Sequence, residues 1–350
     1  MNAVTQAEKF QGCLAGAAIS DAMGMPSETL TREQIRALTM GLGIDGFIRP
    51  IQKRIPETMH LKIGSTTDDW AFTKAVAESI IGCHGYNHEN QVNSHIQVLH
   101  SNIPGMGNTT WEGLTELDQH FKTGGLQGRR PELPATRKPG RGLGNGVAMK
   151  AAPLGLLKSM TSKPTDIANQ ESLNILNMFS KITHGDDIAV ITALLITETI
   201  DWVIKKPIEN KADALTLLNW LLKQVKDLET NYTNTDAQVK VSDQLIILKD
   251  NIDNPERVYQ LIGPGFLATQ SCLMALDGFT RYPTNFRKAV LTAVNNGGDT
   301  DTIASMTGAM CGTNVGINGI PSEWLNFGHG QFQQAAELGG KLYLALTSES

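Results

Sequence analysis

The stretch that decides the fold is FRKAVLTAVNNGGDTDTIASMTGA, residues 286–309. In its first half, apolar residues recur at the spacing of one helix face: Phe286, Ala289, Val290, Ala293 and Val294. The pattern stops at an Asn-Asn-Gly-Gly run, which is typical of a helix end. A second helix is expected after it, over residues 302–309. The stretch therefore predicts two helices joined by a glycine turn that carries two aspartates.

The same helical period recurs along the chain. It predicts helices over residues 70–81, 147–157, 187–203, 218–228, 236–250, 266–274 and 331–346. Short alternating runs of β-branched or aromatic residues, which would indicate strands, are almost absent. The predicted fold class is all-α.

Composition excludes several kinds of protein. With 350 residues and 41% hydrophobic side chains, the chain can build a sizeable core. Thirty basic against 35 acidic residues, a net charge of −5, provide no basic field for nucleic acid. The four cysteines have no metal-binding spacing, and no apolar run reaches the length of a membrane span. We expect a cytoplasmic protein without nucleic-acid or membrane partners.

Two clusters of carboxylates and hydroxyls stand apart from ordinary helix sequence. One is NNGGDTDT at residues 295–302, and the other is STTDDW at residues 65–70, each at an expected helix start. Asp and Thr also cap helices, and acidic residues compensate the helix dipole, so each cluster alone has a structural explanation. Two clusters of the same type favour a shared site. Their hard oxygen ligands suit Mg²⁺ or Mn²⁺.

Two segments rich in glycine and other small residues, and one basic loop, are less specific functional signals than the acidic clusters. GLGNGVAMK, residues 142–150, is a glycine turn before a helix, where backbone N–H groups suit a phosphate, but it matches neither a P-loop nor a Rossmann fingerprint. Small residues dominate 12–28, which indicates close helix packing. Residues 123–146 form either a solvated loop or an anion-facing lid, with five basic residues: Arg129, Arg130, Arg137, Lys138 and Arg141.

Together, these segments resemble the ADP-ribosylglycohydrolase family. The matching motifs, in family order over residues 12–325, are GCLAGAAISDAMGMPSE, TTDDWAFTKAVAES, GNGVAMKAAPLGLL, ITHGDDIAVITALL, AVNNGGDTDTIASMTGAMCG and IPSEWL. The resemblance implies a single all-α domain over residues 1–350, an orthogonal helical bundle with two divalent cations, Mg²⁺ or Mn²⁺, in a central cleft. It also implies hydrolysis of the bond between ADP-ribose and a protein side chain.

The resemblance also implies roles for individual residues. The metal ligands would be Thr67, Asp68, Asp69, Asp299, Asp301 and Thr302, and the catalytic residues Glu28, Asp69 and Asp299. The substrate-binding residues would be Gly144, Asn145, Gly146, Met149 and His184. We expect the ions to bind the ribose hydroxyls and to activate water, with Glu28 assisting proton transfer as acid or base.

Three positions depart from the family pattern: Trp70 after the paired aspartates, Lys150 in place of Arg, and Ser20 before Asp21. Trp70 would narrow the cleft or change the surroundings of the ligands. The stretch Ala152-Pro153-Leu154 favours an arginine linkage in the substrate. A serine linkage, a small-molecule conjugate, a catalytically silent ADP-ribose-binding protein and a generic two-metal phosphoesterase stay as alternatives.

Overall fold

The computed structural model describes residues 3–51, 58–122, 142–161 and 170–348. The basic residues of the loop expected to be a lid, from Arg129 to Arg141, lie outside these ranges. The α-helices are α1 (Gln6–Gly24), α2 (Arg32–Leu38), α3 (Asp68–Cys83), α4 (His88–His100), α5 (Asn108–Lys122), α6 (Ala152–Thr161), α7 (Gln170–Ser180), α8 (Asp187–Lys205), α9 (Lys211–Glu229), α10 (Val241–Asp250), α11 (Pro255–Leu261), α12 (Ala268–Arg281), α13 (Phe286–Asn295), α14 (Thr300–Val315), α15 (Ser322–Leu325) and α16 (Gln331–Thr347). Short 3₁₀ helices cover Met25–Ser27, Thr58–His60, Ala148–Lys150 and Ile317–Gly319.

The all-α prediction is confirmed, since the described ranges contain helices and no strand. Several boundaries differ: the helices predicted over 266–274, 302–309 and 218–228 extend over Ala268–Arg281, Thr300–Val315 and Lys211–Glu229. The helix predicted over 147–157 is a 3₁₀ turn followed by α6, and Pro153 lies in the first turn of α6, where its missing N–H is tolerated. The helix predicted from 236 begins at Val241, and the backbone N–H of Asp236, ahead of it, donates to Asp186 Oδ2 at 2.9 Å.

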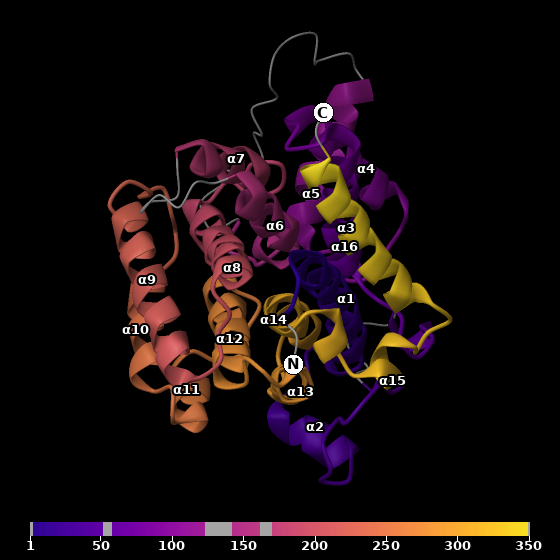
Figure 1. Cartoon of the computed structure of the whole chain (residues 1–350), viewed down its shortest axis with the longest axis vertical. Helices are drawn as coiled ribbons and strands as arrows, with labels where there is room; N and C mark the ends of the chain where they lie inside the picture. The colour runs from indigo at the N-terminus through magenta and orange to yellow at the C-terminus, as the bar shows by residue number, and fades with distance from the viewer. Residues whose placement is uncertain (1–2, 52–57, 123–141, 162–169, 349–350) are drawn as a thin grey trace.

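Helices α1 and α14 form the centre of the molecule and run antiparallel (Figure 1). They touch through glycines: a Cβ at Gly12 would lie 2.2 Å from the carbonyl oxygen of Gly312, and one at Gly16 would lie 2.2 Å from that of Gly308. Only glycine allows two backbones to approach this closely. The contact therefore explains the small residues of the 12–28 segment.

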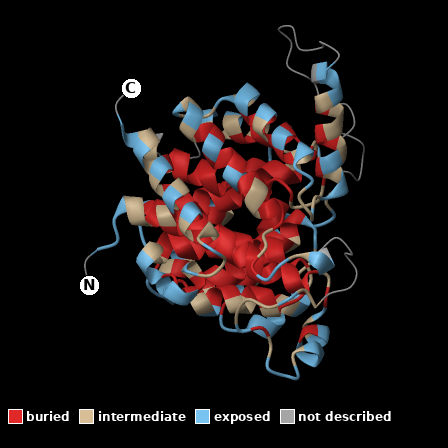
Figure 2. Cartoon of the chain, turned by 90° about the vertical axis from the view of Figure 1, so that its right-hand side faces the viewer, coloured by how far each residue is buried: buried red, intermediate tan, exposed pale blue. Residues whose placement is uncertain are grey.

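The remaining helices surround this pair. α16 packs on α1, α13 and α12 pack on α14, and α8 lies between α6, α12 and α14. α9, α10 and α11 lie at the outer side of α8 and α12 (Figure 1). Figure 2 shows buried residues filling the middle of the bundle and exposed residues on its peripheral helices. In the described ranges no helix combines the length and apolar character that crossing a membrane requires.

The antiparallel contact has a direct consequence for the polar residues. The C-terminal end of α1 meets the N-terminal end of α14, where a Cβ at Gly24 would lie 2.2 Å from the carbonyl oxygen of Thr300. The hydroxyl of Thr300 donates a hydrogen bond to the carbonyl oxygen of Gly24 at 2.8 Å. The segment after α1, with Glu28, therefore lies beside the aspartates that begin α14.

Candidate functional site

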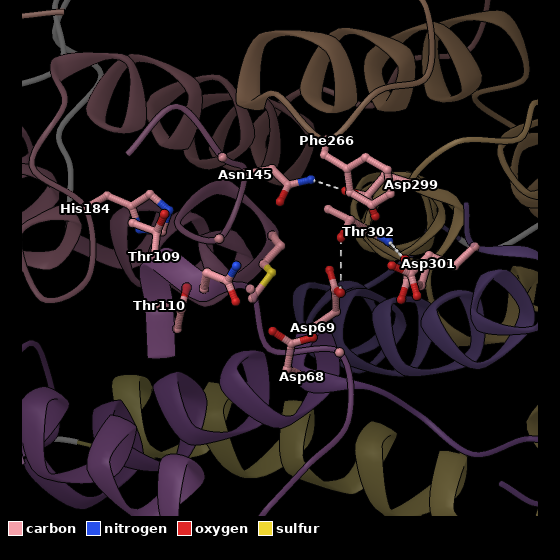
Figure 3. A pocket seen from close by; sticks show the side chains of 17 residues that line it. Asp68, Asp69, Thr109, Thr110, Asn145, His184, Phe266, Asp299, Asp301 and Thr302 are labelled. Carbon is pink, nitrogen blue, oxygen red and sulfur yellow. Dashed lines mark hydrogen bonds between the residues drawn. The ribbon is translucent and has the colours of Figure 1, made fainter. Parts of the chain in front are cut away.

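Two acidic clusters that are 230 positions apart in the chain meet in one cavity. Thr302 Oγ1, in the first turn of α14, donates to Asp69 Oδ2, in the first turn of α3, at 3.1 Å (Figure 3). The cavity has a volume of about 230 Å³, and Asp68, Asp299 and Asp301 also line it. The prediction that the two clusters share a site therefore agrees with the geometry.

Glu28 is the fifth carboxylate of the cavity and comes from the segment after α1. It follows the 3₁₀ turn Met25–Ser27, and its carboxylate, that of Asp299 and that of Asp301 each offer an oxygen within 4.8 Å of the other two. Glu28 Oε2 and Asp69 Oδ1 are buried and have no hydrogen-bond partner among the residues that the structure describes. Within the described ranges no lysine or arginine forms an ion pair with the five carboxylates that line the cavity.

Five buried carboxylates without a counter-ion are costly, because burial and mutual repulsion both disfavour their ionised form. Burial, with the charge of Asp301 next in importance, raises the pKa of Glu28 to about 10 and that of Asp68 to about 7. The same two causes raise the pKa values of Asp69 and Asp299 well above their ordinary range. Divalent cations remove this cost, and a donor set of carboxylates and threonine hydroxyls fits them.

Asp21 holds the first turn of α3 in place, a role that the sequence analysis missed. Its carboxylate accepts hydrogen bonds from the backbone N–H of Thr67 (3.0 Å), the hydroxyl of Thr67 (2.9 Å) and the backbone N–H of Trp70 (3.0 Å). Thr67 itself is fully buried and, unlike the other predicted ligands, is not among the residues that line the cavity. The only sequence signal was an aspartate at the polar end of an otherwise apolar helix.

The turn before α14 is held between two other loops. Gly297 and Gly298 both have φ of +77°, a conformation that glycine adopts without strain. The backbone N–H of Gly298 donates to the carbonyl oxygen of Leu30 at 2.7 Å, and that of Asp299 donates to the carbonyl oxygen of Pro264 at 3.1 Å. The glycines therefore set the direction in which Asp299 enters the cavity.

The glycine turn at residues 144–146 forms the opposite wall. Asn145 Nδ2 donates to Asp299 Oδ2 at 2.6 Å (Figure 3). A Cβ at Gly146 would lie 2.9 Å from His184 Cε1, so only glycine fits beside that ring. Gly144, Met149 and His184 line the same cavity. All five residues predicted to bind substrate are therefore brought together.

Several lining residues were not predicted. They come from the loop before α5, from the first turn of α5 and from the loop before α12: Gly105, Gly107, Asn108, Thr109, Thr110 and Phe266. None of them belongs to a cluster of carboxylates or to a glycine-rich motif, so nothing in the sequence marked them. Trp70, expected to narrow the cleft, is half-buried against the core and does not line the cavity.

Comparison with known proteins agrees with this site. A family model described as ADP-ribosylglycohydrolase matches residues 2–349. The uncharacterized protein YegU of Escherichia coli K12 is 28% identical, with 89% of each chain covered, and ADP-ribosylhydrolase ARH3 of Xenopus tropicalis is 23% identical, covering 96% of this chain and 95% of the relative.

The fold also matches a solved structure. A chain titled ADP-ribosylglycohydrolase-related protein complex superposes with a TM-score of 0.65 at 20% identity, over 97% of this chain and 99% of that chain. The predicted all-α fold of this type is thereby confirmed, and the predicted enzyme class is confirmed by the family match and by the relatives named as ADP-ribosylhydrolases. The chain belongs to the ADP-ribosylglycohydrolase family.

Proposed function

We propose that the protein is a metal-dependent hydrolase that removes ADP-ribose from modified protein side chains. The observation that carries this proposal is the group of five buried carboxylates beside the glycine turn, without a basic partner in the described ranges. A generic phosphoesterase would explain the carboxylates, but it would leave the close packing of Gly146 against His184 without a purpose.

Charge balance supports two divalent cations. Burial raises the pKa of Glu28 to about 10, so this carboxyl is neutral near pH 7, and the four aspartates Asp68, Asp69, Asp299 and Asp301 carry four negative charges when ionised, which two such ions neutralise. Thr67 and Thr302 would complete the ligand set, with Mg²⁺ or Mn²⁺ as the ion. When bound, the ions would supply Lewis-acid activation of water and of the ribose hydroxyls.

The other residues would act directly on the substrate. The turn at 144–146 would receive the diphosphate on its backbone N–H groups, and His184 would line the same side. Asn145, which donates to Asp299, would keep that carboxylate oriented. Glu28 keeps one buried oxygen without a partner and would move the proton that hydrolysis requires.

An arginine linkage is the first candidate for the substrate. Phe266 is 48% exposed and lines the same cavity as Asp299 (Figure 3). An exposed aromatic face next to carboxylates suits a guanidinium group, which stacks on rings and pairs with anions. Release of ADP-ribose from arginine-modified and serine-modified proteins, measured side by side, tests this choice, and faster release from serine would reject it.

The test of the proposed activity uses Asp299→Ala and Asp301→Ala. We expect both variants to lose turnover and to bind Mn²⁺ more weakly in calorimetry. Asp250→Ala, at an exposed position at the end of α10, is the matched control and keeps both properties. Full activity of both site variants in chelator-treated buffer would rule the proposal out. Binding of ADP-ribose by the wild type without any release would instead indicate a catalytically silent binding protein.

A further inference from the structure

A buried lysine lies beneath the proposed diphosphate site. Lys150 ends the 3₁₀ turn Ala148–Lys150 and is completely buried. Its Nζ lies 4.7 Å from the ring centroid of Phe72 and 5.7 Å from that of Phe179. Within the described ranges, no carboxylate lies at ion-pair distance from it. Burial of an amine is costly, and here the two aromatic rings and the charge of Asp68 offset part of that cost.

In the described part of the chain, Lys150 Nζ forms one hydrogen bond, and this bond leads to the cavity. The nitrogen donates to Thr183 Oγ1 at 3.3 Å, and Thr183 Oγ1 lies 2.9 Å from His184 Nδ1. All three residues are buried, and the far side of the His184 ring lines the cavity. A continuous chain of polar atoms therefore joins Lys150 to the ring that faces the glycine turn.

Proton counting along this chain assigns a tautomer to His184. Burial lowers the pKa of Lys150 to about 7, and the nitrogen keeps N–H bonds to donate in both protonation states. Thr183 Oγ1 accepts one of them, and in the described part of the chain His184 Nδ1 is the remaining hydrogen-bond partner of that hydroxyl, so we assign the hydroxyl hydrogen to Nδ1. Nδ1 is then an acceptor, and the proton of a neutral ring is on Nε2.

We propose that Lys150 and Thr183 are positioning residues that hold His184 in its Nε2–H tautomer, so that the ring donates a hydrogen bond to an anionic oxygen of the ligand at the glycine turn. Burial, with the charge of Lys150 as second cause, lowers the pKa of His184 to about 3, so the ring is neutral near pH 7. A neutral ring in the other tautomer would direct a lone pair at that oxygen. The tautomer therefore decides whether Nε2 of His184 attracts or repels the anionic oxygen of the ligand.

The inference rests on the proposed function only in taking ADP-ribose as the ligand. The tautomer itself can be measured without ligand, from the ring ¹⁵N shifts of His184 in labelled protein, with a His184→Gln variant for assignment. We expect the Nε2–H pattern in the wild type and in Lys150→Arg and Thr183→Ser, which keep the donor and the hydroxyl. Thr183→Val and Lys150→Met should lose it.

Binding of ADP-ribose, measured by calorimetry, is the second readout. A lost hydrogen bond to a charged oxygen corresponds to a Kd that is about 10-fold to 100-fold higher. We expect this increase in Thr183→Val, with KM rising more than kcat falls, and recovery in Thr183→Ser. Thr199→Val is the matched control, because Thr199 is equally buried in α8 and its hydroxyl donates to the carbonyl oxygen of Leu195.

An Nδ1–H tautomer in the wild type overturns the inference. So does unchanged affinity in both Thr183→Val and Lys150→Met, provided that the wild type binds ADP-ribose. A wild type that does not bind ADP-ribose contradicts the proposed function instead, and the ring shifts of the ligand-free protein then decide the inference alone.

Discussion

Replacing Asp68 by asparagine is expected to stabilise the metal-free protein at neutral and higher pH. Asp68 is only 4% exposed, and burial together with the charge of Asp301 raises its pKa from 3.8 to about 7. At about 1.4 kcal/mol per pH unit, ionising this carboxyl in the folded state costs about 4 kcal/mol. Because the folded state holds the proton more tightly than the unfolded state, the cost grows from about pH 4 to about pH 7 and then stays constant.

Asparagine has nearly the same shape and no charge to bury. In chelator, we expect the free energy of unfolding of Asp68→Asn, relative to wild type, to increase by about 3 kcal/mol between pH 5 and pH 8. His95 and His184, whose buried rings have lowered pKa values, titrate in both proteins and cancel in the difference, whereas Lys150 loses the attraction of Asp68 in the variant, which reduces the gain. With saturating Mg²⁺ the order should reverse, because the wild type keeps a ligand that the variant lacks.

Urea unfolding at pH 5, 6, 7 and 8, with chelator and with Mg²⁺, measures both effects. A variant that is less stable than wild type at pH 8 in chelator would refute the assignment of a buried, costly charge to Asp68. Equal stabilisation of both proteins by Mg²⁺ would refute its assignment as a ligand.

Three further substitutions test how the site is built. Gly308→Ala should destabilise the fold by about 1–3 kcal/mol in urea unfolding, since its Cβ would lie 2.3 Å from the carbonyl oxygen of Gly16, whereas Gly82→Ala, with open space around it, should not; equal effects would contradict the close-contact argument. Asp21→Ala leaves the donors of Thr67 without their acceptor, and we expect at least about tenfold weaker Mn²⁺ binding in calorimetry. Wild-type affinity in that variant would show that the first turn of α3 needs no such support. Asn145→Ala should lower kcat/KM for ADP-ribose release about 10-fold to 100-fold, and an unchanged value would remove Asn145 from the site.

The sequence predicted helices where apolar residues recur on one helix face. It predicted the acidic site from two clusters of aspartates and threonines. The likeness of residues 65–70 to residues 295–302 was enough to predict one shared site, because both place hard oxygens at a helix start. The all-α class followed from the regular apolar spacing. These features depend on local pattern, so a single sequence carries them.

What the sequence did not reveal depends on contacts between distant segments. Nothing in the local pattern indicated that Asp21 would accept three hydrogen bonds from the first turn of α3. Phe266 enters the cavity from a loop, where side-chain direction follows from packing and not from a period, and Thr110 enters it from the first turn of α5. Lys150 was noted only as a departure from the family pattern, and its connection to His184 became visible through two interatomic distances.

The glycine contact between α1 and α14 also sets distances within the acidic site. Glu28 follows one of these helices and Asp299 precedes the other, so the register of the pair sets the separation of the two carboxylates. Sliding α14 along α1 by a single turn would displace Asp299 by about 5.4 Å, more than the present spacing of these oxygens. Because both glycine contacts, Gly12 with Gly312 and Gly16 with Gly308, form together in this register only, they help to determine the separation of carboxylates that lie two to four turns away.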